Sequence, residues 1–375
     1  MTENTTRKRK SDRSVRNIKQ PSEKQRILAK KSVRDHFAII AVALIATLLA
    51  YVYRTYFAIQ DIPLVREAFE VRNLLGKGKG IVALRNIQRG ELLLKEKPLF
   101  VVPSAISHTS PGALILSSLA RLTHSQRQSF YNLSYVHLPE NLEPDTPQYN
   151  DELALAIFQT NAVSAGSDGV GIFPRMARLN HGCSKAFNVV YSWRENERAI
   201  VVHALKDIKQ GQELLTTYTD TKRPRSERRQ LLEAHYGFTC QCSVCSLLEA
   251  ESRKSDERLS KMATLYSQFK SWAEGAITGR EAIDIVNKIW QVGEEEGYHS
   301  ERGQLAADAV YIAASHSDGD AVRAWAQLSH QWYSLELGLD SEQAQAMAGL
   351  RQHPEQHGRW GAHRPELVGG PILVQ

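Results

Sequence analysis

The sequence predicts an α+β fold in which a β-rich unit is interrupted by a helical insertion and followed by a helical region. Two blocks of short apolar runs, cut by glycines, lie at residues 71–102 and 170–219 and are typical of strands. Apolar residues at helical spacing fill residues 104–165 between them and return from 247 to 350. With 375 residues, the chain is long enough for two modest folded units.

A basic arm precedes this body. Residues 1–36 have almost no large apolar side chains and are expected to be disordered. Residues 1–35 hold twelve Lys/Arg and four Asp/Glu, so the rest of this chain of net charge +6 sums to −2. That balance argues against direct nucleic-acid binding by the folded body. The run RKRK at Arg7–Lys10 fits a nuclear or nucleic-acid signal, but the basic flank of a membrane segment is the preferred reading.

A candidate transmembrane helix follows the arm. Residues 37–53, FAIIAVALIATLLAYVY, form a run without a charge, and as a helix they would span about 26 Å. The run is apolar on all sides, which favours a single-pass membrane anchor over a buried core helix. The long basic region before it disfavours a cleaved signal peptide. The expected location is a membrane, with nucleus or cytoplasm as the alternative, and the topology stays open.

The elements of the body follow in order. The first block predicts strands at IVAL, ELLLKE and LFVV, with the NIQRG turn between the first two. In the insertion, 104–165, helices are expected at 114–121, 125–131 and 152–165, with a Pro/Asp-rich loop at 141–151. The second block predicts strands at FNVVYSW, AIVVHAL and ELLTTY. The β-rich domain with its insertion therefore covers residues 70–220.

The remainder of the chain is expected to be mainly helical. Residues 221–246 contain a basic helical stretch that leads into a cysteine cluster. Residues 247–350 predict four helices, each ended by Gly or a polar turn. They fit a degenerate tetratricopeptide-like array or an irregular bundle equally well. Residues 351–375 are expected to be a loose tail.

The four cysteines predict one metal centre. Cys240, Cys242 and Cys245 form C-x-C-x-x-C, a spacing that lets three thiolates converge on one ion. Zinc takes four ligands, and Cys183 is the single cysteine left to complete the set. The alternative is a group of structural thiols, whereas a disulfide framework does not suit a chain of this size. A shared ion would fasten the segment after Tyr236 to the loop that contains Cys183.

These motifs, taken in order, resemble those of the SET-domain lysine methyltransferases. They are GKGKG before the first strand, N-H-x-C in the middle, Tyr at the end of ELLTTY, and GF-x-C-x-C-x-x-C. The helical insertion and helical C-terminal region are similar to the SET-and-MYND (SMYD) group, in particular its fungal members. The resemblance covers residues 70–246 well and 247–350 loosely. It implies a β-rich SET fold with a pseudoknot-like threading through 180–183 and 216–218, and a zinc-bound post-SET segment.

The resemblance also implies the site residues. Tyr218 is the implied catalytic residue. The implied contacts of S-adenosyl-L-methionine are Lys77, Gly78, Lys79, Asn161, Asn180, His181, Tyr218 and Phe238. The implied zinc ligands are Cys183, Cys240, Cys242 and Cys245. Four cysteines cannot also supply the MYND zinc module, so the insertion is expected to lack it. Gly182 replaces the commoner Ser of N-H-S-C and is expected to loosen the loop slightly.

The residue types suit methyl transfer. Displacement at a sulfonium needs a neutral amine, an aligned methyl group and dry walls more than a strong base. Glycines at alternate positions of GKGKG let the backbone approach a ligand, and the Asn180 amide suits a zwitterionic amino-acid group. Tyr191 and Tyr236 would add ring faces to a lysine channel.

The predicted function is therefore S-adenosylmethionine-dependent methylation of a protein lysine. The expected partner is a protein substrate with a reactive lysine, either a histone or a non-histone protein. The alternative is a non-catalytic, SET-derived adaptor that binds a protein through its helical C-terminal region. A DNA-binding zinc protein is a poor third reading, because the body carries no basic surplus.

Overall fold

The computed structural model describes residues 67–104 and 110–372. The basic arm at 1–36 and the apolar run at 37–53 lie outside the described residues. The prediction of a membrane protein is corrected here on one finding: none of the helices within the described ranges has the length and apolarity needed to cross a bilayer. The single-pass anchor, the membrane as a partner and the membrane location are not retained.

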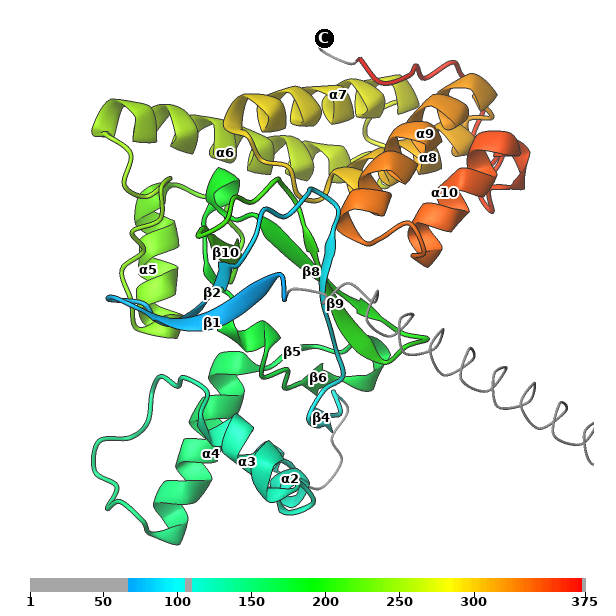
Figure 1. The fold of residues 1–375 in the computed structure, drawn as a ribbon. Coiled ribbons are helices and arrows are strands. Elements are labelled where there is room, and N and C mark those ends of the chain that lie inside the picture. Colours follow the sequence, from blue (N-terminus) through cyan, green and yellow to red (C-terminus); the bar gives the residue numbers. More distant parts are fainter. Residues whose placement is uncertain (1–66, 105–109, 373–375) are drawn as a thin grey trace, which may run out of the picture. The chain divides into compact units, whose positions relative to one another are not determined.

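The β-rich unit consists of three small sheets rather than one continuous sheet (Figure 1). Their strand orders are β1-β2-β10-β7, β3-β9-β8 and β4-β6-β5. The strands are β1 (Phe69–Leu74), β2 (Gly78–Ala83), β3 (Leu92–Glu96), β4 (Val101–Val102), β5 (Val163–Ser164), β6 (Val170–Gly171), β7 (Asn180–His181), β8 (Val189–Arg194), β9 (Ala199–Ala204) and β10 (Glu213–Thr216). Strand β9 is buried at every position because β3 and β8 flank it, which explains its continuous apolar run. Strand β1 was not among the predicted strands.

The insertion between the two halves of this unit is helical and has its own core. Its helices are α2 (Pro111–Ala120), α3 (His124–Tyr131) and α4 (Pro147–Asn161). Phe130 and Ile157 are fully buried there. Helix α4 begins inside the predicted 141–151 loop, because the Thr146 side chain caps it and Pro147 occupies its first turn.

Helix α5 (Arg225–Tyr236) packs against the cysteine segment and is followed by an array of helices. The array consists of α6 (Glu249–Lys270), α7 (Gly279–Glu296), α8 (Arg302–Ser315), α9 (Gly319–Glu336) and α10 (Glu342–Gln352). Helices α6 to α9 correspond to the four expected stretches, although α6 ends at Lys270, before the expected end at Gly275, and α10 is an addition. Trp325 is fully buried at the centre of the apolar core that these helices share.

The C-terminal segment differs from the expected loose tail. After α10 a short 3-10 turn at Pro354–Gln356 leads into an irregular segment that lies against the helices. Val368 is buried, and its backbone N–H donates to Asp318 Oδ2 (2.8 Å). The Trp325 indole N–H donates to the Gly369 carbonyl (3.1 Å). A buried anchor and backbone hydrogen bonds therefore hold a segment whose composition alone suggested disorder.

Candidate active site and zinc centre

The site begins with a crossing of two segments that lie far apart in the sequence. Strand β10 pairs antiparallel with β2 at its start and parallel with β7 at its end. In the parallel part, Leu215 faces Asn180 and Thr216 faces His181. The Gly182 N–H then donates to the Thr216 carbonyl (2.7 Å). This pairing brings the Asn-His pair beside Tyr218, two residues beyond the end of β10.

His181 links Tyr218 to the cysteines. The backbone N–H of Tyr218 donates to His181 Nδ1 (3.0 Å), and His181 Nε2 lies 3.1 Å from Cys183 Sγ. A backbone N–H can only donate, so Nδ1 accepts and Nε2 carries the proton that points at the sulfur. Burial lowers the pKa of His181 to about 4, so the ring is neutral near pH 7. One neutral imidazole therefore fixes the Tyr218 backbone relative to Cys183.

Tyr218 is held through both its backbone and its hydroxyl. The hydroxyl donates to the Leu179 carbonyl (2.7 Å), and the ring centre lies 4.9 Å from that of Tyr236. Desolvation raises the pKa of Tyr218 well above its usual range, and the nearby Tyr236 and Glu213 act in the same direction. The hydroxyl thus stays protonated near neutral pH, as its donation to the Leu179 carbonyl requires.

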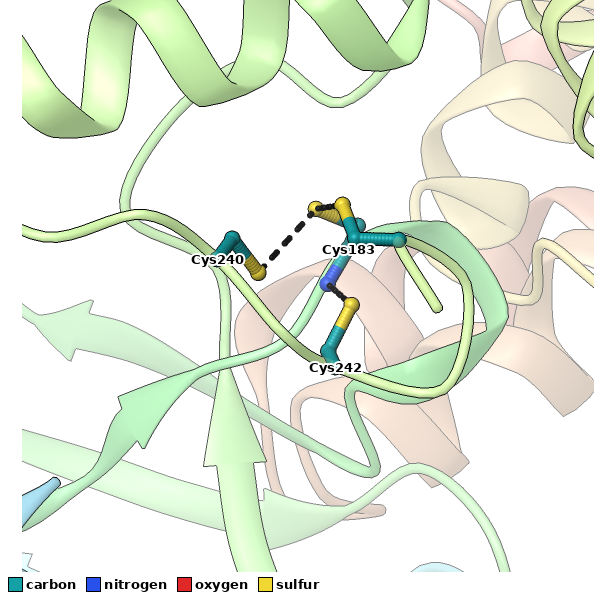
Figure 2. Close-up of side chains that lie close together, drawn as sticks. Cys183, Cys240 and Cys242 are labelled. Atoms are coloured by element: carbon teal, nitrogen blue, oxygen red, sulfur yellow. Dashed lines mark hydrogen bonds between the residues drawn. The ribbon is translucent and has the colours of Figure 1, made fainter. Parts of the chain in front are cut away.

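The four cysteines gather into one buried cluster. The Sγ atom of Cys183 lies 4.0 Å from that of Cys240 and 3.6 Å from that of Cys245, and the Cys183 N–H points at Cys242 Sγ (3.5 Å). Figure 2 shows Cys183, Cys240 and Cys242 pointing toward one another from two separate segments. All four Sγ atoms lie within 4.8 Å of one another. Tetrahedral zinc–thiolate bonds of about 2.3 Å place sulfurs roughly 3.8 Å apart, so the group fits a zinc ion.

A buried arginine balances this cluster. The Arg228 side chain is 1% exposed, lies 3.9 Å from Cys245 Sγ through Nη2, and pairs with Asp256 (3.1 Å). Four thiolates around one Zn²⁺ leave a net charge of −2, which a nearby guanidinium partly offsets. No local signal in the sequence points to Arg228, because its partner Asp256 lies on α6 and its sulfur neighbour lies beyond α5.

We call the segment from Asn180 to Phe187 the Asn-His corner. Gly182 does not loosen this corner, contrary to the expectation. A Cβ atom at this position would lie 2.8 Å from the backbone N of Phe187 and 3.1 Å from its Cα. The chain turns back on itself here through the 3-10 turn Ser184–Ala186, so backbone fills the space that a side chain would need. In this chain glycine makes the corner compact.

The glycine-rich segment meets the Asn-His corner through Glu213. Lys77 Nζ lies 2.6 Å from Glu213 Oε2, and Asn180 Nδ2 donates to Glu213 Oε1 (2.9 Å). A Cβ at Gly80 would lie 2.7 Å from Asn180 Nδ2, so only glycine permits this approach of β2. Lys77 and Asn180, two candidates for cofactor contact, thus already bind one carboxylate, that of Glu213. The same two side chains could bind the carboxylate of an amino-acid group. Sequence reasoning missed Glu213, which has no local signal at the start of ELLTTY.

The other predicted cofactor residues lie around this arrangement at different distances. Phe238 packs beside the cysteine cluster, with its ring centre 6.4 Å from that of His181. Lys79 turns the other way and donates to Asn132 Oδ1 (2.5 Å). Asn161 ends α4, and its Nδ2 donates to the carbonyls of Ser134 and Ile157 (both 2.7 Å). Gly78 has φ +69°, a left-handed conformation that suits glycine.

A pocket of about 370 Å³ opens at Tyr218. Its walls come from the end of α4, the end of α5, the loop after α3 and the residues after β10. The lining residues are Val136, His137, Gln159, Thr160, Tyr218, Thr219, His235 and Tyr236. Gln159 and Thr160 immediately precede Asn161 on α4. The described site therefore offers a hollow that Tyr218 helps to line.

Comparison with known proteins agrees with this geometry. The family model described as "SET domain" matches residues 78–219. This chain carries a SET domain. The matched segment contains the β2–β10 pairing, the Asn-His corner and Tyr218. The predicted resemblance and fold class are thereby confirmed.

Three curated relatives are similar to the chain. "Histone-lysine N-methyltransferase set5" of Schizosaccharomyces pombe is 29% identical over 79% of this chain and 87% of its own length. "N-lysine methyltransferase SMYD2-B" of Danio rerio is 41% identical over 21% of this chain and 17% of its own length. "N-lysine methyltransferase SMYD2" of Homo sapiens is 30% identical over 39% of this chain and 31% of its own length. The match to the two SMYD2 proteins is thus confined to less than a third of their lengths.

Proposed function

We propose that this SET-domain protein transfers a methyl group from S-adenosylmethionine to a lysine side chain of another protein. The observation that carries the proposal is the crossing of β7 and β10, which brings Asn180 and His181 beside Tyr218, a residue that lines a pocket. The adaptor alternative has no comparable support, because an adaptor would not need a desolvated tyrosine hydroxyl at such a place.

The residues fit the cofactor at its polar end. Asn180 offers an amide, Lys77 a cation, and the Gly80 backbone a surface without a side chain. When bound, S-adenosylmethionine supplies an electrophilic methyl group on a sulfonium. Lys77 and Asn180 would hold its amino-acid group, and Phe238 would cover its apolar part.

Tyr218 and its neighbours would prepare the lysine. The Tyr218 hydroxyl oxygen and the Leu179 carbonyl present two acceptors at one place, which together can bind the N–H groups of an uncharged amine and leave its lone pair free. The faces of Tyr236 and Tyr191 would receive the lysine while it is still cationic. Desolvation of the amine against these rings would then favour its neutral, nucleophilic form, because burial lowers the pKa of a lysine.

The test compares cofactor binding and turnover in the full chain. We expect wild-type protein to bind S-adenosylmethionine in calorimetry and to transfer labelled methyl groups to protein substrates. Tyr218→Phe should keep cofactor affinity within about threefold and lose at least about 100-fold in kcat, a loss typical of a removed orienting hydrogen bond. Tyr311→Phe is the matched control, because Tyr311 lies on helix α8, outside the site, and packs edge-on against Trp272.

The substrate class needs its own arm of the experiment. Purified histones and a histone-free protein extract should be offered separately, since the set5 relative is named for histone lysines. Binding of S-adenosylmethionine without transfer to either set would favour the adaptor alternative. A protein that does not bind the cofactor at all would refute the proposal.

A further inference from the structure

A buried carboxylate of the helical region reaches the SET domain. Glu296 ends α7, and its side chain is fully buried. Its Oε1 accepts from Ser184 Oγ (2.7 Å) and Ser255 Oγ (2.6 Å), and its Oε2 accepts from Arg258 Nε (2.9 Å). Ser255 and Arg258 belong to α6, so they and Glu296 come from the helical region. Ser184 alone comes from the SET domain.

Ser184 has a strained backbone and directly follows the zinc-ligand candidate Cys183. Its φ is +42°, a left-handed value that costs conformational free energy for any residue with a Cβ. Such a conformation persists where surrounding contacts hold it. The side chain is 1% exposed, and its hydroxyl donates to Glu296 Oε1. The carboxylate of α7 is thus the group that can hold Ser184 in this conformation.

The contact extends along the next residues of the corner. Gly297, with φ +69°, ends α7 close to Lys185: a Cβ at Gly297 would lie 3.3 Å from Lys185 Cβ. The rings of Phe187 and Tyr298 pack edge to face with centres 5.8 Å apart. The end of α7 and the two residues after it therefore contact Ser184, Lys185 and Phe187.

We propose that Glu296 is a positioning residue for the cofactor site. It holds Ser184 in the left-handed conformation and thereby sets the direction in which the chain leaves Cys183. Three residues earlier stands His181, whose ring fixes the Tyr218 backbone. This inference rests on the proposed function, because it assigns the helical region a part in binding the methyl donor.

A carboxylate suits this position better than a neutral group would. Three hydrogen-bond donors on two elements converge on it, and the Arg258 guanidinium balances its buried charge (2.8 Å from Nη2). Removing one partner from such a network leaves buried polar groups unpaired. The corner and the helical region are thus energetically coupled, so the effects of substitutions in the two should not be additive.

The experiment uses four single variants and one double variant of the full chain. Ser184→Ala removes the hydroxyl but keeps the Cβ at φ +42°, whereas Ser184→Gly removes both. Ser255→Ala is the matched control, since it removes a hydrogen bond to the same Glu296 oxygen from within the helical region. Glu296→Gln weakens the network with little change of shape. The readouts are the Kd for S-adenosylmethionine, the kcat and KM of methyl transfer, and the rate of zinc release to a chelator.

The expected pattern separates positioning from general stability. Ser184→Ala and Glu296→Gln should each raise the Kd and KM for the cofactor about tenfold, speed zinc release and leave kcat within about twofold. In Ser184→Gly the Kd and KM for the cofactor should stay within about threefold of wild type, because glycine adopts the left-handed conformation unaided. In Ser255→Ala they should stay within about twofold of wild type. In the Ser184→Gly background, Glu296→Gln should raise the cofactor Kd less than about threefold, and this smaller effect would show that the two residues are coupled.

Two results would overturn the inference: equal effects of Ser184→Ala and Ser255→Ala on cofactor affinity, or no effect of Ser184→Ala on any readout. If Glu296→Gln does not fold, the serine variants still decide the question. If the wild type binds no cofactor, the proposed function fails, and the zinc-release rates of the same variants decide the role of Glu296.

Discussion

The compactness of the Asn-His corner predicts a large effect of the smallest substitution, Gly182→Ala. The added Cβ would lie 2.8 Å from Phe187 N, 3.1 Å from Ala186 C and 3.1 Å from Phe187 Cα, all shorter than ordinary contact. All three atoms are backbone, so none can rotate away, and the 3-10 turn after Cys183 must move. Overpacking of this kind costs about 1–3 kcal/mol, and contact with three backbone atoms places the expected loss near about 2 kcal/mol.

Thermal unfolding and metal content measure this effect. With an unfolding entropy of about 2.1 cal/mol/K per residue and the roughly 300 residues that the structure describes, a loss of about 2 kcal/mol lowers Tm by about 3 °C. Because the turn follows Cys183, zinc should also leave Gly182→Ala faster than wild type. The matched control is Gly349→Ala in α10, where an added Cβ meets nothing within 4 Å. That change should stabilise the protein by about 0.5–1 kcal/mol, as alanine does in an exposed helix interior. An unchanged Tm and zinc-release rate in Gly182→Ala would refute the account of the corner.

Three further predictions test the site and the helical region. Cys183→Ser should lower zinc content by metal analysis and weaken cofactor binding, because His181 loses the sulfur that its Nε2 faces; full zinc occupancy would contradict the four-cysteine assignment. The rate of methyl transfer should rise with pH from 7 to 9, because more substrate lysine becomes neutral. Ionisation of Tyr218 should cause no decline in this range, because burial raises the pKa of its hydroxyl. A decline while the protein stays folded would argue against a neutral Tyr218. Burial raises the pKa of Glu336 to about 7, so folding favours its protonated form, and the contribution of this carboxyl group to stability should fall by about 3 kcal/mol as pH rises from 4 to 8. In Glu336→Gln this contribution should vanish from the Tm–pH profile, and an unchanged profile would count against the assignment.

Much of the fold follows from local patterns. Apolar residues at helical spacing placed α6 to α9, and short apolar runs placed β8 and β9, because these elements bury one face or are wholly buried. Strand β1 and helix α10 carry weaker patterns: β1 has a mostly exposed side, and α10 buries only Ala344 and Met347. The α4 boundary was misjudged because Pro147 belongs equally to a loop and to a first helical turn.

The candidate site divides in the same way. The cysteine spacing and the order of the short motifs pointed to Cys183, Asn180, His181 and Tyr218 without any coordinates. Glu213, Arg228 and Glu296 could not be found in that manner, because each acts on a partner that lies far away in the chain. Their roles arise only when β10 crosses β7 and the helices close over the corner.

The linear chain on its own determined the chemistry: which residues carry thiols, amides and a phenol, and in what order they come. Folding decided the protonation states and the contacts of these groups, since burial keeps the Tyr218 hydroxyl protonated and the His181 ring uncharged. Chemical identity is a local property of each residue. Desolvation, steric closure at Gly182 and the reach of Glu296 to Ser184 depend on which distant segments meet, and no window of sequence contains that information.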